Sequence, residues 1–153
     1  MKLFKYLMGV VLAATVVSCE MPEQQTPTKY PDLETIANTL WYSVDTKNQI
    51  YYDINYYEST GTMVGYSNSL REEEVSNRSF TYTFTPATDD IPSIVNVAFD
   101  DGQFYGGFTV PKGNFQVNNE DVYWIQLYEV DKEGNVIYDI YGNMKSSILM
   151  WMK

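Results

Sequence analysis

The fold of this chain is decided at residues 79–85, Ser-Phe-Thr-Tyr-Thr-Phe-Thr. Aromatic side chains alternate there with hydroxyl side chains, and a period of two residues is the pattern of a β-strand with one buried face and one face in water. The same alternation recurs at residues 50–56, where isoleucine and tyrosine share one face while Asp53 and Asn55 lie on the other. The sequence therefore predicts half-buried strands.

Strand patterns continue on both sides of these segments, because aromatic and β-branched residues dominate the chain and turn residues interrupt them at near-regular intervals. The strands that we expect are residues 39–46, 49–58, 61–68, 78–85, 93–100, 103–111, 121–131, 134–142 and 146–152. Several links between them are short and contain glycine, as at Gly61, Gly102 and Gly134. Links of this kind join only antiparallel neighbours, so the sequence predicts an up-and-down meander.

An all-β meander of eight or nine strands without helical crossovers protects its edges by closing into a barrel or by folding into a sandwich. We expect the barrel, and the β-sandwich is the alternative. The adjacent residues Gly106 and Gly107 predict a bulge or a sharp bend of the kind that barrels need at corners. Before the first strand, residues 32–38 have a short helical pattern with Asp32 as a candidate N-cap.

The N-terminal segment predicts an export signal. Two lysines precede an apolar run at residues 7–17, whose 11 residues are too few to cross a hydrocarbon core of about 30 Å. The run Val16-Val17-Ser18-Cys19 resembles the lipoprotein box of bacteria, which implies cleavage between Ser18 and Cys19 and acyl chains on Cys19. The alternatives are an ordinary secretory signal and an N-terminal anchor helix.

This resemblance divides the chain into three parts. They are a signal peptide at residues 1–18, a lipidated Cys19 with an extended, proline-rich tether to residue 31, and one barrel domain at residues 32–153. Two or three acyl chains hold a protein on a bilayer almost permanently. The resemblance therefore implies a lipid anchor in the bacterial cell envelope, in the outer membrane, with the periplasmic and the surface face both left open.

A family resemblance appears where the first strand begins. A short helical turn that leads into Asn38-Thr39-Leu40-Trp41-Tyr42, followed by a meander, resembles the small lipocalin-like lipoproteins over about residues 33–152. Lipocalins open this strand with a glycine, any residue and a tryptophan that closes the barrel bottom. Here Asn38 stands where the glycine would be, one extra residue precedes Trp41, and the base nearest the end is Lys153 rather than an arginine that could stack on the tryptophan. The resemblance implies an up-and-down barrel.

Composition excludes most catalytic chemistry. The chain has no histidine and a single cysteine, which excludes Ser-His-Asp and Cys-His catalysis, the usual zinc and copper sites and an internal disulfide. Twenty acidic residues against ten basic ones give a formal charge of −10, which argues against a nucleic-acid partner. We expect a protein that is not an enzyme and needs no cofactor or metal.

Carboxylate chemistry is the catalytic option that remains. Asp53 and Asp139 lie in the middle of expected strands among aromatic residues, where a carboxylate that faces a lumen would have a raised pKa. The alternative is that both face solvent from the polar side of an alternating strand. Nothing in the sequence pairs two carboxylates across a sugar site, as glycoside hydrolysis requires.

Tyrosine is the most conspicuous residue type, with 14 copies. It suits half-buried strands, and it also supplies rigid surface for stacking on sugars, apolar ligands or another protein. The candidate ligand-binding residues are Tyr52, Tyr56, Trp124 and Tyr138. We expect a non-catalytic binding module for a small apolar or glycan ligand. The alternative is an acidic protein-interaction lipoprotein, such as an inhibitor or immunity protein for a basic partner.

Overall fold

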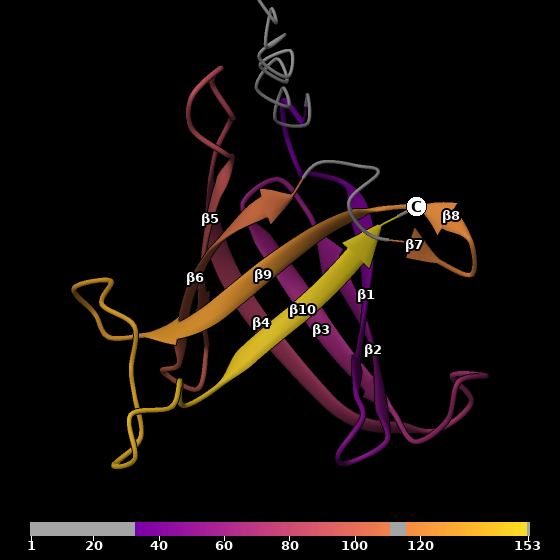
Figure 1. Ribbon diagram of the computed structural model, residues 1–153. Coiled ribbons are helices and arrows are strands. Elements are labelled where there is room, and N and C mark those ends of the chain that lie inside the picture. Colours follow the sequence, from indigo (N-terminus) through magenta and orange to yellow (C-terminus); the bar gives the residue numbers. More distant parts are fainter. Residues whose placement is uncertain (1–32, 111–115, 153) are drawn as a thin grey trace, which may run out of the picture.

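The computed structural model describes residues 33–110 and 116–152 (Figure 1). The expected signal peptide at residues 1–18, the cleavage site at Ser18 and Cys19, and the tether to residue 31 lie outside the described residues. Over the described ranges, the chain contains no helix with the length and hydropathy to cross a membrane.

Eight antiparallel strands close into a barrel, in the order β1-β10-β9-β6-β5-β4-β3-β2. The barrel strands are β1 (Thr39–Asp45), β2 (Ile50–Tyr56), β3 (Thr60–Tyr66), β4 (Glu74–Thr85), β5 (Ile94–Phe99), β6 (Phe104–Val110), β9 (Tyr123–Val130) and β10 (Ser147–Met152). Two short strands, β7 (Gln116–Val117) and β8 (Glu120–Asp121), form a separate hairpin between β6 and β9. The predicted all-β meander and its closure into a barrel are confirmed, and the sandwich alternative is wrong.

Alternation places the core inside this barrel. On β4 the ring of Phe80 is buried and Tyr82 and Phe84 are partly buried on the same face, while Thr81 and Thr83 are exposed on the other. The buried apolar residues are Ile36, Trp41, Ile54, Tyr56, Met63, Phe80, Val95, Val97, Phe99, Tyr105, Ile125, Leu127 and Met150. Burial of this apolar surface is the main driving force for folding.

A row of aromatic rings connects the strands across the interior. The ring centroids of Tyr56 and Phe80 are 5.2 Å apart, those of Phe80 and Phe99 are 5.4 Å apart, and those of Phe99 and Tyr105 are 5.7 Å apart. All three pairs meet edge to face, which is the arrangement that the charge distribution of aromatic rings favours. The row connects β2, β4, β5 and β6 through side chains, in addition to the backbone pairing of each strand with its neighbours in the barrel.

The bulge that we expected at Gly106 and Gly107 is not found, because the pairing of β6 with both neighbours runs without a register shift. The one recorded irregularity among the barrel strands lies between Gly65 and Tyr66, where β3 pairs with β4. Gly107 is instead required by the close approach of two strands. A Cβ atom built there would lie 1.9 Å from the carbonyl oxygen of Gln126, so only glycine lets β6 and β9 approach this closely.

The expected helical turn at residues 32–38 is also wrong, since residues 33–38 form a bend and a turn without a helix. So short a segment gains too few hydrogen bonds to offset helix nucleation. The turn instead places Ile36, which is fully buried, in the core. Next to it, the indole N–H of Trp41 donates to Thr39 Oγ1 (2.8 Å) and the Thr39 hydroxyl donates to the carbonyl of Ile36.

The expected strand at residues 134–142 does not form. Residues 131–146, which we call the β9–β10 arm, fold as two successive turns. One isolated β-bridge joins Val130 to Val136 across the first turn, and another joins Tyr138 to Met144 across the second. Asp131 and Asp139 open these turns, and local hydrogen bonds to their carboxylates compete successfully with strand pairing. The arm projects from the barrel at the start of β10 (Figure 1).

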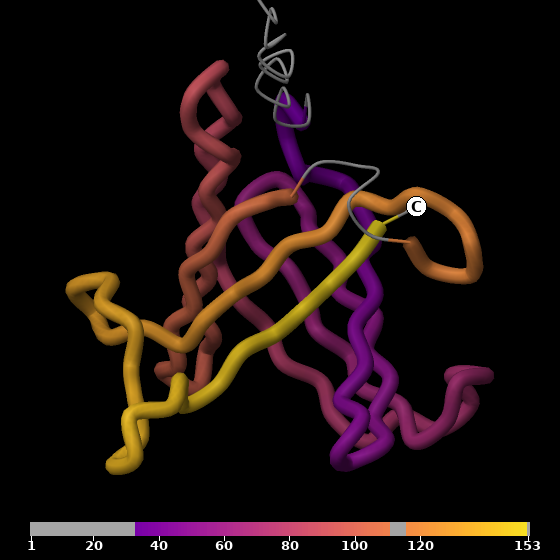
Figure 2. Tube along the Cα trace, viewed as in Figure 1, coloured from indigo at the N-terminus to yellow at the C-terminus, as the bar shows by residue number. Residues whose placement is uncertain are grey.

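The two ends of the barrel differ. At the end where β1 begins, the turn with Ile36 lies over the core, and we call this the closed end. At the other end lie the links 46–49, 67–73 and 100–103 together with the β9–β10 arm, and we call this the mouth end. Figure 2 shows the described N-terminal residues and the arm at opposite ends of the barrel.

Candidate functional site

A cavity of about 390 Å³ opens at the mouth end of the barrel, and we call it the mouth cavity. Its lining is more polar than the core beneath it, because serine, threonine, tyrosine and arginine side chains take part. The residues that matter most for its chemistry are Ser43, Tyr52, Met63, Arg78, Tyr105 and Ile148. The alternation of each strand points these side chains inward.

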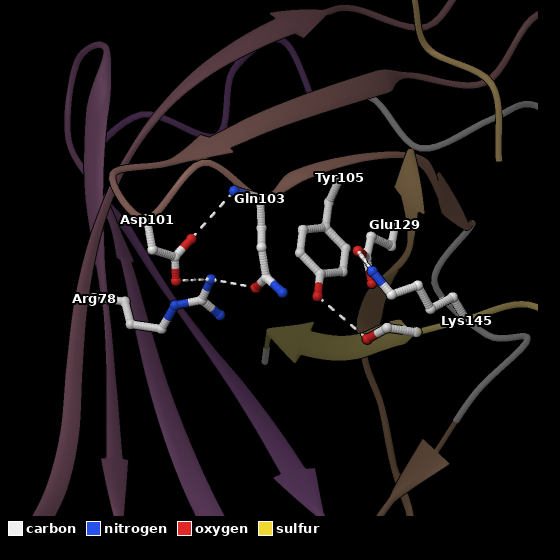
Figure 3. Close-up of polar contacts among 7 residues, drawn as sticks. Arg78, Asp101, Gln103, Tyr105, Glu129 and Lys145 are labelled. Atoms are coloured by element: carbon white, nitrogen blue, oxygen red, sulfur yellow. Dashed lines mark hydrogen bonds and ion pairs between the residues drawn. The ribbon is translucent and has the colours of Figure 1, made fainter. Parts of the chain in front are cut away.

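Arg78 is the principal charged group of the cavity. It lies two residues before Phe80 on β4, so it shares the inward face. Its Nη2 atom lies 2.6 Å from Asp101 Oδ2 and 2.6 Å from Gln103 Oε1, and its guanidinium lies 3.8 Å from the centre of the Phe99 ring. Figure 3 shows Arg78 directed toward Asp101 and Gln103. The guanidinium is thus oriented by an ion pair, a hydrogen bond and an aromatic face.

One hydrogen-bond donor of Arg78 has no partner among the described residues. The Nε atom is buried, and no residue in the described part of the chain accepts a hydrogen bond from it. A buried donor without a partner costs roughly 1–3 kcal/mol relative to a hydrogen-bonded one. A ligand with an acceptor oxygen would satisfy this donor once a rotation of the Arg78 side chain brings Nε to the cavity.

A second ion pair lies beside the first. Glu129 faces inward on β9, opposite Tyr105 in the register with β6, and Lys145 of the arm reaches its Oε1 at 2.6 Å. The Glu129 side chain is only 7% exposed, while that of Lys145 is 54% exposed. The hydrogen bond with Glu129 raises the pKa of Lys145, so its ammonium group stays charged at neutral pH.

Hydroxyl groups complete the cavity. Tyr105 and Ser146 share a hydrogen bond of 3.2 Å, and the Ser43 hydroxyl donates to the carbonyl of Leu149 at 2.6 Å. Burial raises the pKa of Tyr52, so its phenol remains a neutral donor. The cavity therefore presents charged and neutral donors together with aromatic surface, a combination that binds oxygen-rich ligands.

Of the four residues predicted to bind a ligand, only Tyr52 lines the mouth cavity. Tyr56 is fully buried in the core, where burial raises its pKa and its hydroxyl contacts Met150 Sδ at 3.5 Å. Trp124 lies on the outer face of β9, in register with Trp151. Tyr138 lies on the β9–β10 arm with 59% of its surface exposed. The structure does not bring these four side chains together.

The two aspartates that we considered for carboxylate chemistry lie outside the lumen. Asp53 is on the outer face of β2 and forms an ion pair with Arg71, whose guanidinium lies 5.0 Å from the centre of the Tyr42 ring. Asp139 is in the second turn of the arm, where hydrogen bonds from the backbone of Asn143 lower its pKa. Among the residues that the structure describes, no cluster of three or more acidic, cysteine or histidine side chains could hold a metal ion.

Sequence reasoning missed Arg78, Tyr105 and Glu129, although a signal was present. Arg78 falls two residues before Phe80, and Glu129 falls two residues after Leu127. A charged residue in phase with the buried face of an alternating strand is unusual, because an isolated buried charge is costly. A charged residue on the buried face is therefore a better marker of a site inside the barrel than an aromatic residue is. An aromatic residue on that face can belong to the core as readily as to a binding site.

A second hollow lies on the outer surface. This groove of about 530 Å³ runs between the outer faces of β4, β5 and β6 and the base of the arm, and Thr83, Asn96 and Phe104 contribute to it. None of its lining residues has a buried side-chain atom without a hydrogen-bond partner. The groove therefore gives weaker evidence of a ligand-binding site than the mouth cavity does.

No family model, curated protein or solved structure matches this chain. The function is therefore inferred from the chemistry of the mouth cavity and of the surfaces around it.

Proposed function

We propose that the protein is a lipid-anchored lipoprotein of the bacterial outer membrane whose lipocalin-like barrel binds a small glycan in the mouth cavity. The observation that carries this proposal is Arg78, a cation fixed inside the cavity with its buried Nε donor unused. A sugar hydroxyl or ring oxygen can accept this hydrogen bond. Tyr52 and Tyr105 offer aromatic surface for the sugar ring beside it.

A glycan is favoured over an apolar ligand because the deep interior is filled by the protein itself. Trp41, Ile54 and Phe80 are almost fully buried there, along with the other core residues. The space that remains lies at the mouth, where polar groups line it. A fatty acid or a similar ligand would leave these groups without partners, which is unfavourable.

The position of the cavity supports the proposed anchoring. Cys19 and the tether precede the domain in sequence, and the described chain enters at the closed end with Ile36. The mouth cavity lies at the opposite end. An anchored domain would therefore present its mouth away from the point where the tether joins it.

Titration of defined saccharides tests this proposal. The full chain, extracted in detergent micelles, is titrated with N-acetylglucosamine oligomers, dextran oligosaccharides and mannose oligosaccharides, and with decanoate as an apolar probe. Binding is followed by tryptophan and tyrosine fluorescence. We expect at least one saccharide to bind and Arg78→Met to weaken it by about tenfold or more, because a hydrogen bond from a charged donor contributes roughly 1.5–3 kcal/mol.

The matched control is Arg71→Met. Arg71 also forms an ion pair and contacts an aromatic ring, but it lies on the outer surface. We expect its substitution to leave saccharide affinity unchanged. Equal affinities of the Arg78→Met variant and the wild type, binding of decanoate alone, or no binding to any probe would overturn the proposal.

The second candidate function is protein interaction by an acidic lipoprotein. The observation that favours it is the β9–β10 arm, which exposes several large apolar side chains at the mouth end. Such exposure is uncommon on a monomeric protein and marks sites of interaction.

A further inference from the structure

The β9–β10 arm is built from one five-residue turn used twice. Asp-Lys-Glu-Gly-Asn at residues 131–135 and Asp-Ile-Tyr-Gly-Asn at residues 139–143 share the pattern of aspartate, two variable residues, glycine and asparagine. In each turn the glycine has a positive φ, 88° at Gly134 and 81° at Gly142. That conformation is accessible to glycine at little cost.

The two turns also share their hydrogen bonds. Asp131 Oδ1 accepts the backbone N–H of Asn135 at 2.8 Å, and Asp139 Oδ1 accepts that of Asn143 at 2.9 Å. Each aspartate accepts a second N–H two residues on, at Glu133 and at Tyr141. The side chain and backbone of Asn135 lower the pKa of Asp131 by hydrogen bonding, and the backbone of Asn143 lowers the pKa of Asp139. The arm is thus an ordered structure that fixes the residues at its two tips.

The tips differ in chemistry although their backbones match. The first turn carries Lys132 and Glu133, as expected for a surface loop. The second turn carries Ile140 and Tyr141, which are 91% and 82% exposed. Tyr138 and Met144, bridged to each other at the base of the second turn, add further exposed apolar surface.

Apolar side chains held on an ordered backbone in this way are well suited to binding a protein. Aromatic and aliphatic residues that fill a partner's pocket supply most of the affinity of many interfaces. Because local hydrogen bonds already order the turn, binding would cost little additional conformational entropy. The second tip therefore has the properties of a pre-formed anchor.

Charge identifies the kind of partner. The links 46–49, 67–73 and 100–103 of the mouth end and the β9–β10 arm together carry seven carboxylates and four basic groups. Opposite charges steer association and like charges oppose it. A basic surface would therefore be attracted to this end, whereas a second copy of this acidic chain would be repelled.

We propose that the second turn of the β9–β10 arm docks into an apolar cleft on a basic protein. Ile140 and Tyr141 enter the cleft, and the acidic links of the mouth end face its basic rim. This inference rests on the second candidate function and does not require a glycan in the mouth cavity, since neither Ile140 nor Tyr141 lines that cavity.

The test uses defined proteins as probes. The full chain in detergent micelles is immobilised, and its affinity is measured for lysozyme and anhydrochymotrypsin, two basic proteins with an open cleft or pocket. Cytochrome c, which is basic but has no such cleft, is the comparison. We expect at least one cleft-bearing protein to bind, with an affinity that decreases as salt is added.

Two double variants distinguish the contribution of the apolar second tip to binding from the contribution of the acidic mouth end. Ile140→Ser/Tyr141→Ser removes the apolar tip, and we expect it to weaken binding by about tenfold or more. Lys132→Ser/Glu133→Ser changes the equivalent positions of the first turn and leaves the net charge unaltered. We expect this control to bind as the wild type does.

Four results would overturn the proposal. They are no binding to either cleft-bearing protein, equal binding to cytochrome c, an unchanged affinity in the Ile140→Ser/Tyr141→Ser variant, and tip-dependent binding to phosphatidylcholine vesicles or to a second copy of the chain in place of a basic protein. Saccharide titration of the same Ile140→Ser/Tyr141→Ser variant keeps the two proposals distinct, because its mouth cavity is unaltered.

Discussion

Lys145 Nζ lies 2.6 Å from Glu129 Oε1, so a residue of the β9–β10 arm neutralises a carboxylate that is buried inside the barrel. Without Lys145, the Glu129 carboxylate would remain buried with its charge unpaired. We expect Lys145→Met to lower the free energy of unfolding by roughly 1–3 kcal/mol, the cost of leaving a buried polar group without its hydrogen-bond partner. Urea denaturation measures the change. Adding Glu129→Gln to Lys145→Met should recover most of the loss, and a double variant no more stable than the single one would contradict this explanation.

The pair Gly106 and Gly107 tests the close approach of two strands. A Cβ at residue 107 would lie 1.9 Å from the Gln126 carbonyl oxygen, whereas the atom nearest to a Cβ at residue 106 would be Asn96 Oδ1 at 3.1 Å, with the Val130 side chain at ordinary contact distance. We expect Gly107→Ala to destabilise the barrel by about 3 kcal/mol or more, since the backbone has to move. Gly106→Ala should change the stability by less than about 1 kcal/mol. Thermal unfolding compares the two, and equal effects would contradict the strand geometry.

The closed end depends on Ile36, which is fully buried although it precedes the first strand. We expect Ile36→Ala to cost about 2–5 kcal/mol, as for other large apolar side chains removed from a core. Leu70→Ala is the matched control, because Leu70 is 74% exposed and its loss should change the stability by at most about 0.5 kcal/mol. A variant Ile36→Ala as stable as Leu70→Ala would show that the turn does not contribute to the core.

Acid should loosen the arm. The pKa of Asp139 is lowered in the folded protein by hydrogen bonds from Asn143 and Tyr141. A lowered pKa means that the ionised carboxylate stabilises the turn above the pKa of an unfolded aspartate, about 3.9, and that this contribution is lost as the pH falls through the folded value. We expect the amide resonances of Tyr141 and Asn143 to shift below about pH 4 and not above it. A titration midpoint above the unfolded value would contradict the hydrogen bonding.

The barrel could be predicted from the sequence because its strands follow a period of two with few exceptions. Phe80, Tyr82 and Phe84 alternate with threonines, and this pattern is sufficient to assign both the strand and its buried face. The segment 134–142 was predicted wrongly because its apolar residues also have strand character. The hydrogen bonds of Asp139 and the positive φ of Gly142 impose a turn there in spite of that character.

The candidate site was less predictable, because alternation shows which face a residue occupies but not how deep in the barrel it lies. Tyr52 and Tyr56 share one face of β2, yet Tyr52 lines the mouth cavity and Tyr56 belongs to the core. Depth depends on the tilt of the strands and on which end is closed, and both follow from the closure of β1 on β10. The partners of Arg78 likewise come from a different link of the chain, at Asp101 and Gln103.

The mouth cavity and the β9–β10 arm lie at the same end of the barrel, and Lys145 and Ser146 connect them through contacts with Glu129 and Tyr105. A partner that shifts Lys145 or Ser146 when it docks on the second turn would alter the polar groups beside the site that we propose for the glycan. The two binding events would then be thermodynamically linked, so that the occupancy of one site changes the affinity of the other by the same factor in both directions. The barrel would in this way report to the partner that we propose whether the proposed ligand is present.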